Sequence, residues 1–231
     1  MMKEIYSNDS NFINEVCNVF LSSYPVFIFE FSGVYGLIAS NSIEGVNAIN
    51  ETKKRLPNKF YSTVFGSDAI LKNAKQSKLV ELKDKLLEVF EGSFIRLSVE
   101  NSEINNPLVC NGTHQSLIKR PAYRTIFNEL EKELSKALEP SPFFSFNCFA
   151  PICSSANISG DPSGSITSKQ KALEFAKDRN ISLFVHSNLN ISEQGSYPVF
   201  SIDGNLQVKI ERKGLNDELI LKRAMEVLKE P

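Results

Sequence analysis

Short apolar runs rich in β-forming residues alternate in this chain with longer amphipathic segments, and this alternation limits the folds available to it. Pro25-Val26-Phe27-Ile28-Phe29 has the length and composition of a buried strand. Phe12 to Leu21 and Ser77 to Phe90 instead repeat apolar residues at helical spacing. Strands that alternate with helices are typical of an α/β fold, in which the helices cover the faces of a sheet.

The rest of the chain divides in the same way. Asn41 and Glu44 have the spacing of a capping box and predict a helix that runs to about Lys54. A short helix is expected from Ser67. The other predicted helices are Ala122–Leu138, Ser168–Arg179 and Asn216–Lys229, and the other predicted strands are Tyr35–Ala39, Phe60–Phe65, Phe94–Val99, Ser116–Ile118, Phe143–Phe149 and Ser182–Val185.

A hairpin signal near the C-terminus decides the kind of sheet. Asp203-Gly204 follows Ser201-Ile202 and has the composition of a two-residue hairpin turn. A hairpin requires antiparallel pairing, so the sheet is predicted to be twisted and mixed, with parallel and antiparallel strands. No internal repeat or extended linker is visible, so residues 1–231 are predicted to form a single domain with a core at about 10–214 and a C-terminal helix at about 216–229.

Charge and cysteine content exclude several classes of function. The 26 Lys and Arg residues nearly balance the 27 Asp and Glu residues, so no global field attracts nucleic acid or anionic lipid. No signal peptide is visible and the apolar stretches are too short to span a bilayer, so a cytoplasmic protein with no membrane partner is expected. The four cysteines are scattered and the chain has only two histidines, so no metal site is predicted.

The segment from Ser154 to Ser165 is the most unusual part of the chain. It is rich in Ser, Gly and Asn, follows a hydrophobic run and precedes a predicted helix. Such loops can turn several backbone N–H groups toward one point and cradle a phosphate, to which Ser155 and Asn157 could add side-chain hydrogen bonds. The same composition also suits an ordinary connection between a strand and a helix. The Gly-Lys-Ser/Thr ending of a P-loop is missing.

A second candidate is the cationic run from Lys53 to Lys59, with four positive charges in seven residues at the end of a predicted helix. Cations at a helix C-terminus interact favourably with the helix dipole, which explains one or two of these charges better than four. Polyphosphates need several cations, and Arg binds phosphate oxygens with two parallel hydrogen bonds. The run is therefore a candidate site for a nucleoside triphosphate.

Other polar groups give weaker signals. Lys119, Arg120 and Arg124 form a cationic group at a strand-to-helix junction, where a solvated face is the alternative. His114 and His186 have no sequence-local partner for nucleophilic catalysis, and no Gly-x-Ser-x-Gly elbow is present, which disfavours a hydrolase triad.

Taken in order, these segments resemble the YrdC-like family of threonylcarbamoyl-AMP synthases. The Ser-Ala-Asn-Ile-Ser-Gly run is the most specific part of the resemblance, which extends from about Val26 to Gly214. The segments that match the family's motifs are Val34–Leu37, Lys53–Pro57 with Lys59, Ser154–Ser163, Gly195-Ser196 and Arg212-Lys213-Gly214.

The resemblance implies a YrdC/RibB-like α/β fold with a concave, positively lined cavity. It implies that ATP, L-threonine and bicarbonate are converted to a carbamoyl-adenylate for tRNA threonylcarbamoyladenosine formation, with Mg²⁺ carried by the nucleotide. By the same resemblance, Lys53 and Arg55 are catalytic and hold the phosphates or the carbamate. The implied nucleotide-binding residues are Ser155, Asn157, Ser196, Arg212 and Lys119, the last of which stands where the family commonly has Arg.

One segment departs from the family's pattern and leaves alternatives open. Glu30-Phe31-Ser32-Gly33 replaces the usual Pro-Thr-Asp-Thr, so the amino acid that would be used is not specified. The first alternative is a paralogue that binds nucleotide, double-stranded RNA or tRNA without catalysis. The second is a carbamoyl-transfer enzyme that acts on another acceptor.

Overall fold

The computed structural model describes residues 2–31, 33–56, 59, 61–64, 67–101, 106–162, 164–189 and 195–229. The chain divides into two compact units, each assembled from separate stretches of sequence. Unit 1 consists of Met1–Lys59, Ile126–Glu139 and Pro151–Gly195, and unit 2 of Phe60–Thr125, Pro140–Ala150 and Ser196–Pro231. The single domain over residues 1–231 stays a prediction.

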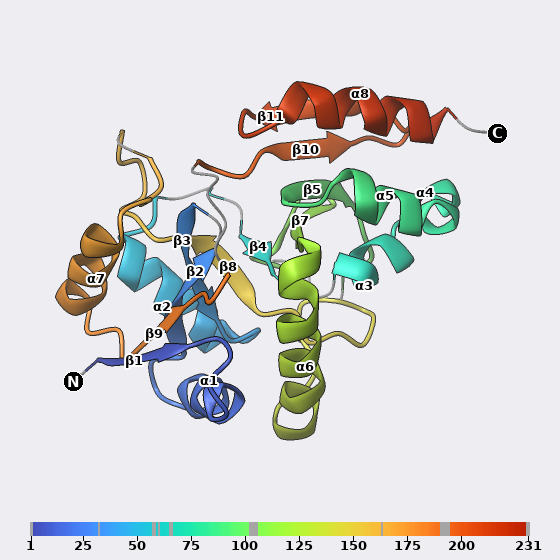
Figure 1. Cartoon of the computed structure of the whole chain (residues 1–231). Helices are drawn as coiled ribbons and strands as arrows, with labels where there is room; N and C mark the ends of the chain where they lie inside the picture. The colour runs from blue at the N-terminus through green and yellow to red at the C-terminus, as the bar shows by residue number, and fades with distance from the viewer. Residues whose placement is uncertain are drawn as a thin grey trace. The chain divides into compact units, whose positions relative to one another are not determined.

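Unit 1 contains a mixed sheet with the strand order β1-β9-β2-β3-β8 (Figure 1). Its strands are β1 (Lys3–Tyr6), β9 (Leu183–His186), β2 (Val26–Phe31), β3 (Val34–Ala39) and β8 (Ile152–Ser155). The first three strands run parallel to one another, whereas β3 is antiparallel to both β2 and β8. The predicted mixture of parallel and antiparallel pairing is confirmed.

Aromatic side chains form the core on one face of this sheet. Successive strand residues point to opposite faces, so Phe27, Phe29 and Phe31 share a face. The Phe27 ring lies 5.8 Å from that of Phe20 in α1 (Phe12–Phe20), and the Phe29 ring lies 5.1 Å from that of Phe127 in α6 (Pro121–Ala137). The aromatic strand β2 is therefore the centre of this core. Unit 1 also contains α2 (Ile43–Lys53) and α7 (Lys169–Asp178), and it contains α6 from Ile126 onward.

Unit 2 contains a second mixed set of strands, in the order β4-β7-β5-β10-β11, with β6 paired to β7. β7 is parallel to β4 and antiparallel to β5, and β10 is parallel to β5 and antiparallel to β11. These strands are β4 (Ser62–Thr63), β5 (Ser93–Ser98), β6 (Val109–Cys110), β7 (Thr113–Ile118), β10 (Val199–Ile202) and β11 (Val208–Arg212).

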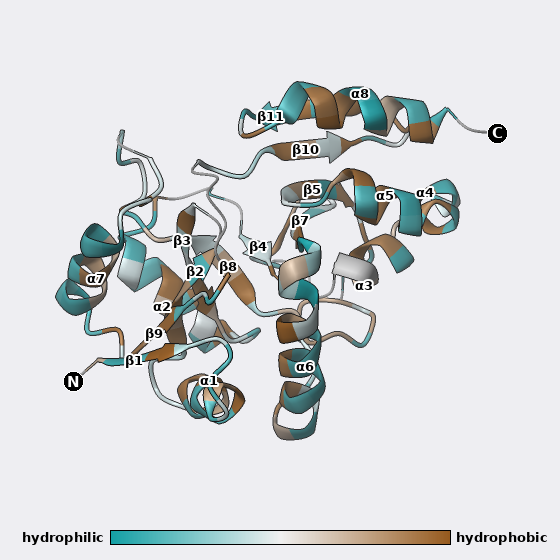
Figure 2. Cartoon of the chain, in the orientation of Figure 1, coloured by the Kyte–Doolittle hydropathy of each residue, from teal (hydrophilic) through white to brown (hydrophobic). Residues whose placement is uncertain are grey.

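The C-terminal helix α8 (Asp217–Leu228) packs on β11 and on α5 (Lys83–Val89). It buries Ile220, Ala224 and Leu228, which are spaced four residues apart and so lie on one face. Figure 2 shows hydrophobic and hydrophilic residues alternating along this helix. The predicted helix at about 216–229 is confirmed, and it belongs to unit 2. The short helices α3 (Ser67–Lys72) and α4 (Ser77–Glu81) complete this unit.

Three predicted elements have different boundaries or structure. The helix predicted from Ser77 to Phe90 is divided at Leu82 into α4 and α5. The predicted strand Phe143–Phe149 is wrong, because this segment forms turns and bends. Here the Ser141 N–H donates to the Cys148 carbonyl at 2.8 Å and the Asn106 side chain donates to the Phe143 carbonyl, so the segment folds back on itself and does not join a strand ladder.

The predicted hairpin is confirmed, but its two-residue turn is wrong. The connection runs from Asp203 to Gln207. The Asp203 carboxylate accepts hydrogen bonds at 2.9 Å from the N–H groups of Asn205 and Gln207, which stabilises a longer loop.

The sequence predicted Asn41 as the N-cap of α2, but the N-cap is Ser42. The Ser42 hydroxyl accepts the N–H of Gly45 at 3.3 Å. A Cβ atom at Gly45 would lie 2.0 Å from the Ser40 carbonyl oxygen, so this turn of the helix requires glycine.

Strand β1 was not predicted. It is short and buries only Ile5, so it lacks the alternation by which a half-buried strand is recognised. Of the predicted strand at 60–65, residues 62–63 form β4, and Phe60 and Phe65 lie outside the described residues.

The aromatic core of unit 1 generates a stability prediction. Replacing fully buried Phe29 with Ala should lower the free energy of unfolding by about 3–5 kcal/mol, since transfer and cavity costs add. Leu21→Ala is the control, because Leu21 is 64% exposed and its truncation should change stability by less than about 0.5 kcal/mol. Urea unfolding monitored by circular dichroism measures both. Similar losses in the two variants would contradict this packing.

Candidate functional site

The cationic run begins at the C-terminus of α2, where the chain makes a tight turn. Lys54, the C-cap, has a left-handed conformation with φ of 46°. The N–H of Arg55 then donates to the Asn50 carbonyl at 3.0 Å, which closes the helix end. Through this turn Lys53 and Arg55 both reach the end of β8, at Ser155 and Ser154.

The Ser-rich segment begins as the last part of a paired strand and then turns back toward α2. Ser155 is paired with Gly36 of β3, and the Ala156 N–H extends the ladder by donating to the Tyr35 carbonyl at 2.8 Å. The Ser159 N–H then donates to the Lys53 carbonyl at 2.9 Å. The turn from Ser155 to Ser159 is thus fixed at one end by the sheet and at the other by the helix.

The Lys53 ammonium is buried within this turn. Only 3% of Lys53 is exposed, and its Nζ donates to the carbonyl of Ser155, to the carbonyl of Asn157 at 2.8 Å and to the Asn157 Oδ1 at 2.9 Å. An ammonium has three N–H donors, so these three oxygens use all of them. Lys53 therefore fastens the Ser-rich turn to the end of α2.

Side chains of the turn form a second layer of contacts. The Ser155 hydroxyl donates to Asn157 Oδ1 at 2.6 Å, so this oxygen accepts from two donors. Arg55 Nη1 donates to the Ser154 hydroxyl at 3.2 Å. The structure therefore brings together Lys53, Arg55, Ser155 and Asn157, as the site prediction requires. Pro57 and Ser163, which belong to the matching segments, lie outside the described residues, as does Asn58 of the cationic run.

The electrostatics of Lys53 are unusual. Burial, with a smaller contribution from the nearby charge of Arg55, lowers the pKa of the Lys53 ammonium from its ordinary 10.5 to about 7. Its hydrogen-bond partners are all neutral oxygens, and within the described ranges no carboxylate pairs with it. The site thus combines two cations with no pairing carboxylate at the buried one, an arrangement that an anion would stabilise.

The remaining predicted site residues lie in unit 2. Arg212 lies at the end of β11 and donates through Nη2 to the Tyr197 carbonyl at 2.7 Å. Tyr197 is the residue that follows Ser196. Arg120 lies 5.7 Å from the Tyr197 ring centroid. Lys119 follows β7 and is only 6% exposed. The assignment of Lys119, Ser196 and Arg212 to a nucleotide stays a prediction.

Sequence reasoning missed a polar chain at the carboxyl end of β2. The Tyr35 hydroxyl donates to Glu30 Oε1 at 2.9 Å, and the Ser187 N–H donates to Glu30 Oε2 at 3.0 Å. His186 lies between Glu4, 2.9 Å from its Nε2, and Glu30, 3.7 Å from its Nδ1. Burial raises the pKa of Tyr35. A glutamate in the otherwise apolar run Val26–Phe31 was the signal that could have revealed this chain.

This chain of side chains shows no sign of being a metal site. The two carboxylates contact opposite nitrogens of the imidazole, so the three groups do not converge on one point. Across the described residues, no group of His, Cys, Asp and Glu side chains could hold a metal ion. Glu30, the first residue of the segment predicted to depart from the YrdC-like pattern, is thus engaged with Tyr35, Ser187 and His186; Ser32 lies outside the described residues.

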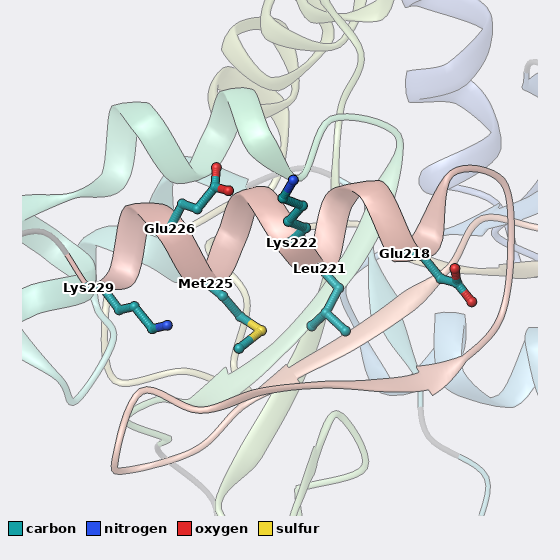
Figure 3. Close-up of a pocket in the computed structure, with 6 residues that line it drawn as sticks. All are labelled: Glu218, Leu221, Lys222, Met225, Glu226 and Lys229. Carbon is teal, nitrogen blue, oxygen red and sulfur yellow. The ribbon is translucent and has the colours of Figure 1, made fainter.

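A surface hollow of about 300 Å³ lies along α8, well outside the predicted motifs. Figure 3 shows its lining residues, which belong to this helix except for Lys229 directly after its end: Glu218, Leu221, Lys222, Met225, Glu226 and Lys229. Alternating Glu and Lys residues at helical spacing are typical of a solvated helix face. None of the predicted site residues lines this hollow.

In the part of the chain that the structure describes, no helix is both long and apolar enough to cross a membrane.

No protein-family model matches the sequence, and no curated protein matches it. Solved structures do match. P. abyssi Sua5, solved in complex with L-threonine, is 18% identical, with a TM-score of 0.68 over 96% of this chain and 61% of that chain. E. coli YciO is 12% identical, with a TM-score of 0.65 over 93% of this chain and 97% of that chain. Full-length HypF, solved in a phosphate- and nucleotide-bound form, is 19% identical, with a TM-score of 0.61 over 87% of this chain and 29% of that chain.

These matches define the class of fold. The chain has an α/β fold of the YrdC-like type, with mixed strand pairing and flanking helices. It is the fold of Sua5 and YciO, which confirms the fold that the sequence resemblance predicted. At 12–19% identity the likeness concerns the fold alone, and this chain spans 61% of the Sua5 chain.

The lowered pKa of Lys53 predicts how stability depends on pH. Between pH 7 and 10.5 the unfolded chain keeps the proton of this lysine while the folded chain releases it, so the free energy of unfolding rises with pH. The slope from Lys53 should reach about 1.4 kcal/mol per pH unit. Urea unfolding at a series of pH values should show this slope in the wild type and lose it in Lys53→Met.

Lys54→Met is the matched control for this prediction. Lys54 is adjacent and exposed, so its replacement should leave the slope unchanged. A Lys53→Met variant with the same pH dependence as the wild type would contradict the burial of a titrating amine.

Proposed function

We propose that this chain is a divergent YrdC-like protein that binds ATP and forms a carbamoyl-adenylate, in the manner of a threonylcarbamoyl-AMP synthase. The observation that carries the proposal is the cationic pair Lys53 and Arg55, held against the Ser-Ala-Asn segment, with no carboxylate of the described residues paired to the buried lysine. The product would supply tRNA threonylcarbamoyladenosine formation in the cytoplasm, where ATP and tRNA are available.

The electrostatics favour an anionic ligand at this site. A buried cation costs free energy unless hydrogen bonds and opposite charge compensate it. Lys53 has the hydrogen bonds but only neutral partners, and Arg55 adds a second positive charge beside it. A polyphosphate would supply the missing negative charge, and in this proposal the hydroxyls of Ser154, at the end of β8, and of Ser155, at the start of the turn, bind its oxygens.

The solved structures of the same fold give supporting analogies. Sua5 was solved in complex with L-threonine and HypF in a phosphate- and nucleotide-bound form, so proteins with this fold bind an amino acid and a nucleotide. A shared fold does not by itself transfer an activity. The proposal for this chain therefore depends on its own Lys, Arg, Ser and Asn residues.

The reaction suits a site without a histidine base. The amine of an amino acid adds to CO₂ derived from bicarbonate and loses a proton, which gives a carbamate. A carbamate oxygen attacks the α-phosphorus of ATP, a new P–O bond forms, and the bond to the β-phosphate breaks as pyrophosphate leaves. Transfer at phosphorus depends mainly on positioning and on stabilising negative charge. In this proposal Arg55 does this for the phosphates or the carbamate.

Mg²⁺ is expected to enter with the nucleotide. The described residues offer no cluster of carboxylates and imidazoles for a resident metal. Mg²⁺ commonly keeps several waters and binds through substrate phosphates.

The amino acid need not be threonine. In this chain the Glu30 carboxylate already accepts hydrogen bonds from Tyr35 and Ser187 and lies next to His186. A carboxylate occupied in this way differs from the hydroxyl-rich segment that the resemblance implies. The proposal is therefore tested with each amino acid, and with carbamoyl phosphate as a probe of the carbamoyl-transfer alternative.

A second candidate function is favoured by one observation, the complete use of the three Lys53 protons by the protein itself. A lysine engaged in this way supports a paralogue that binds nucleotide, double-stranded RNA or tRNA and does not carry out the reaction. RNA binding would depend on a local cationic surface and would weaken steeply with added salt.

Pyrophosphate release distinguishes the two functions. Purified protein with ATP, Mg²⁺, bicarbonate and a suitable amino acid should release pyrophosphate, and Arg55→Gln should weaken ATP binding about ten- to hundred-fold, since a charge-assisted hydrogen bond contributes about 1.5–3 kcal/mol. Lys54→Gln is the control and should bind ATP normally. ATP binding without pyrophosphate release for any amino acid supports the paralogue. Absence of ATP binding sinks the proposed function, and the paralogue is then sunk too unless the protein shows salt-dependent binding to tRNA or double-stranded RNA.

A further inference from the structure

The buried ammonium of Lys53 has a property that follows from counting its protons. It donates to the carbonyls of Ser155 and Asn157 and to Asn157 Oδ1. A protonated lysine has three donors, whereas a neutral amine has two N–H groups and a lone pair. The three contacts observed around Lys53 can exist together only while it is protonated.

We propose that Lys53 acts as a proton-dependent latch on the Ser155–Asn157 turn, so that this site takes up a proton when it binds its anionic ligand. The first half of the proposal concerns the free protein, and the second half rests on the proposed function. Lys53 is then a positioning residue that sets the shape of the turn, and it need not touch the phosphates.

The contact that loosens on deprotonation is the one to the Asn157 side chain. The Asn157 Oδ1 also accepts the Ser155 hydroxyl at 2.6 Å, so it keeps a donor when Lys53 loses a proton. The two backbone carbonyls would otherwise lose the lysine as a donor inside a buried turn, which is costly. Loss of the proton therefore frees the Asn157 side chain, while the turn stays attached to α2 through its backbone.

The charges around Lys53 determine when this happens. On its own element these are Glu51 and Lys54, which are exposed, and Arg55 just beyond the helix end. From the end of α7, Arg179 donates to the Thr52 carbonyl at 2.9 Å. The contacts from the β8 turn are neutral. Burial and Arg55 place the pKa of Lys53 at about 7, so both protonation states are populated near neutral pH.

An anion next to the site would favour the ammonium form and raise the pKa of Lys53. Ligand binding and protonation are then linked, and each strengthens the other by the same factor. Affinity for the anion should decrease as pH rises above about 7, by up to about tenfold per pH unit.

The latch is tested first in the free protein by NMR. The lysine side-chain carbons and the backbone amides of residues 155–158 are followed as the pH is raised. Lys53 should titrate with a midpoint near 7, and the turn amides should shift with the same midpoint. In Lys54→Met both midpoints should remain, and in Lys53→Arg the midpoint of the turn amides should vanish, because Arg stays protonated. A Lys53 midpoint near 10.5, or turn amides that do not follow it, overturns the latch without any variant.

The second test uses ATP as the probe. At about pH 8, where a phosphate group with a second pKa of about 6 is fully ionised, calorimetry in buffers of different ionisation enthalpy counts the protons taken up on binding. The wild type and Lys54→Met should take up close to one proton, and Lys53→Arg close to none. ATP binding with no proton uptake overturns the linkage. Absence of ATP binding overturns the proposed function, and the titration of the free protein then still decides whether the latch exists.

Discussion

The candidate site depends on the hydrogen bonds between one buried ammonium and one turn of backbone. Lys53 connects the C-terminus of α2 to the residues that follow β8, and the Ser159 N–H returns a hydrogen bond to the Lys53 carbonyl. Because the sheet fixes the start of the turn through Tyr35, the turn has little freedom once the lysine is in place. Arg55, Ser154, Ser155 and Asn157 take their positions from this arrangement.

The sequence predicted the regular elements well where periodicity was strong. The aromatic strand at 25–29 and the helices at 12–21, 122–138 and 216–229 were found with small shifts, because each buries a continuous face. The prediction was wrong in two segments, where hydrogen bonds within loops hold the backbone in place of the pairing between strands. The segment after Pro142 carries a strand's composition but folds on itself through Ser141, Cys148 and Asn106. Asp203 likewise extends a turn that composition alone made short.

The candidate site, too, was predicted only in part. The resemblance implied a positively lined cavity that includes the cationic run and the Ser-rich segment, which lie about a hundred residues apart. The structure shows the two segments in contact within unit 1, and the cavity stays a prediction. What the motifs could not indicate is the direction in which Lys53 points. A lysine in a basic run suggests an exposed phosphate ligand, whereas here it is 3% exposed and bonded to carbonyls. The cluster of Glu30, Tyr35 and His186 also joins three strands, so a local pattern could indicate no more of it than the glutamate in the apolar run Val26–Phe31.

The atoms that Lys53 contacts have a consequence for how such a protein can diverge. Two of its three acceptors, and the donor at Ser159, are main-chain groups that nearly every amino acid carries. Side chains in the turn can therefore drift over time while the attachment to the helix survives, with Asn157 as the principal exception. Attachments made by main-chain atoms therefore constrain amino-acid identity less than attachments made by side chains do.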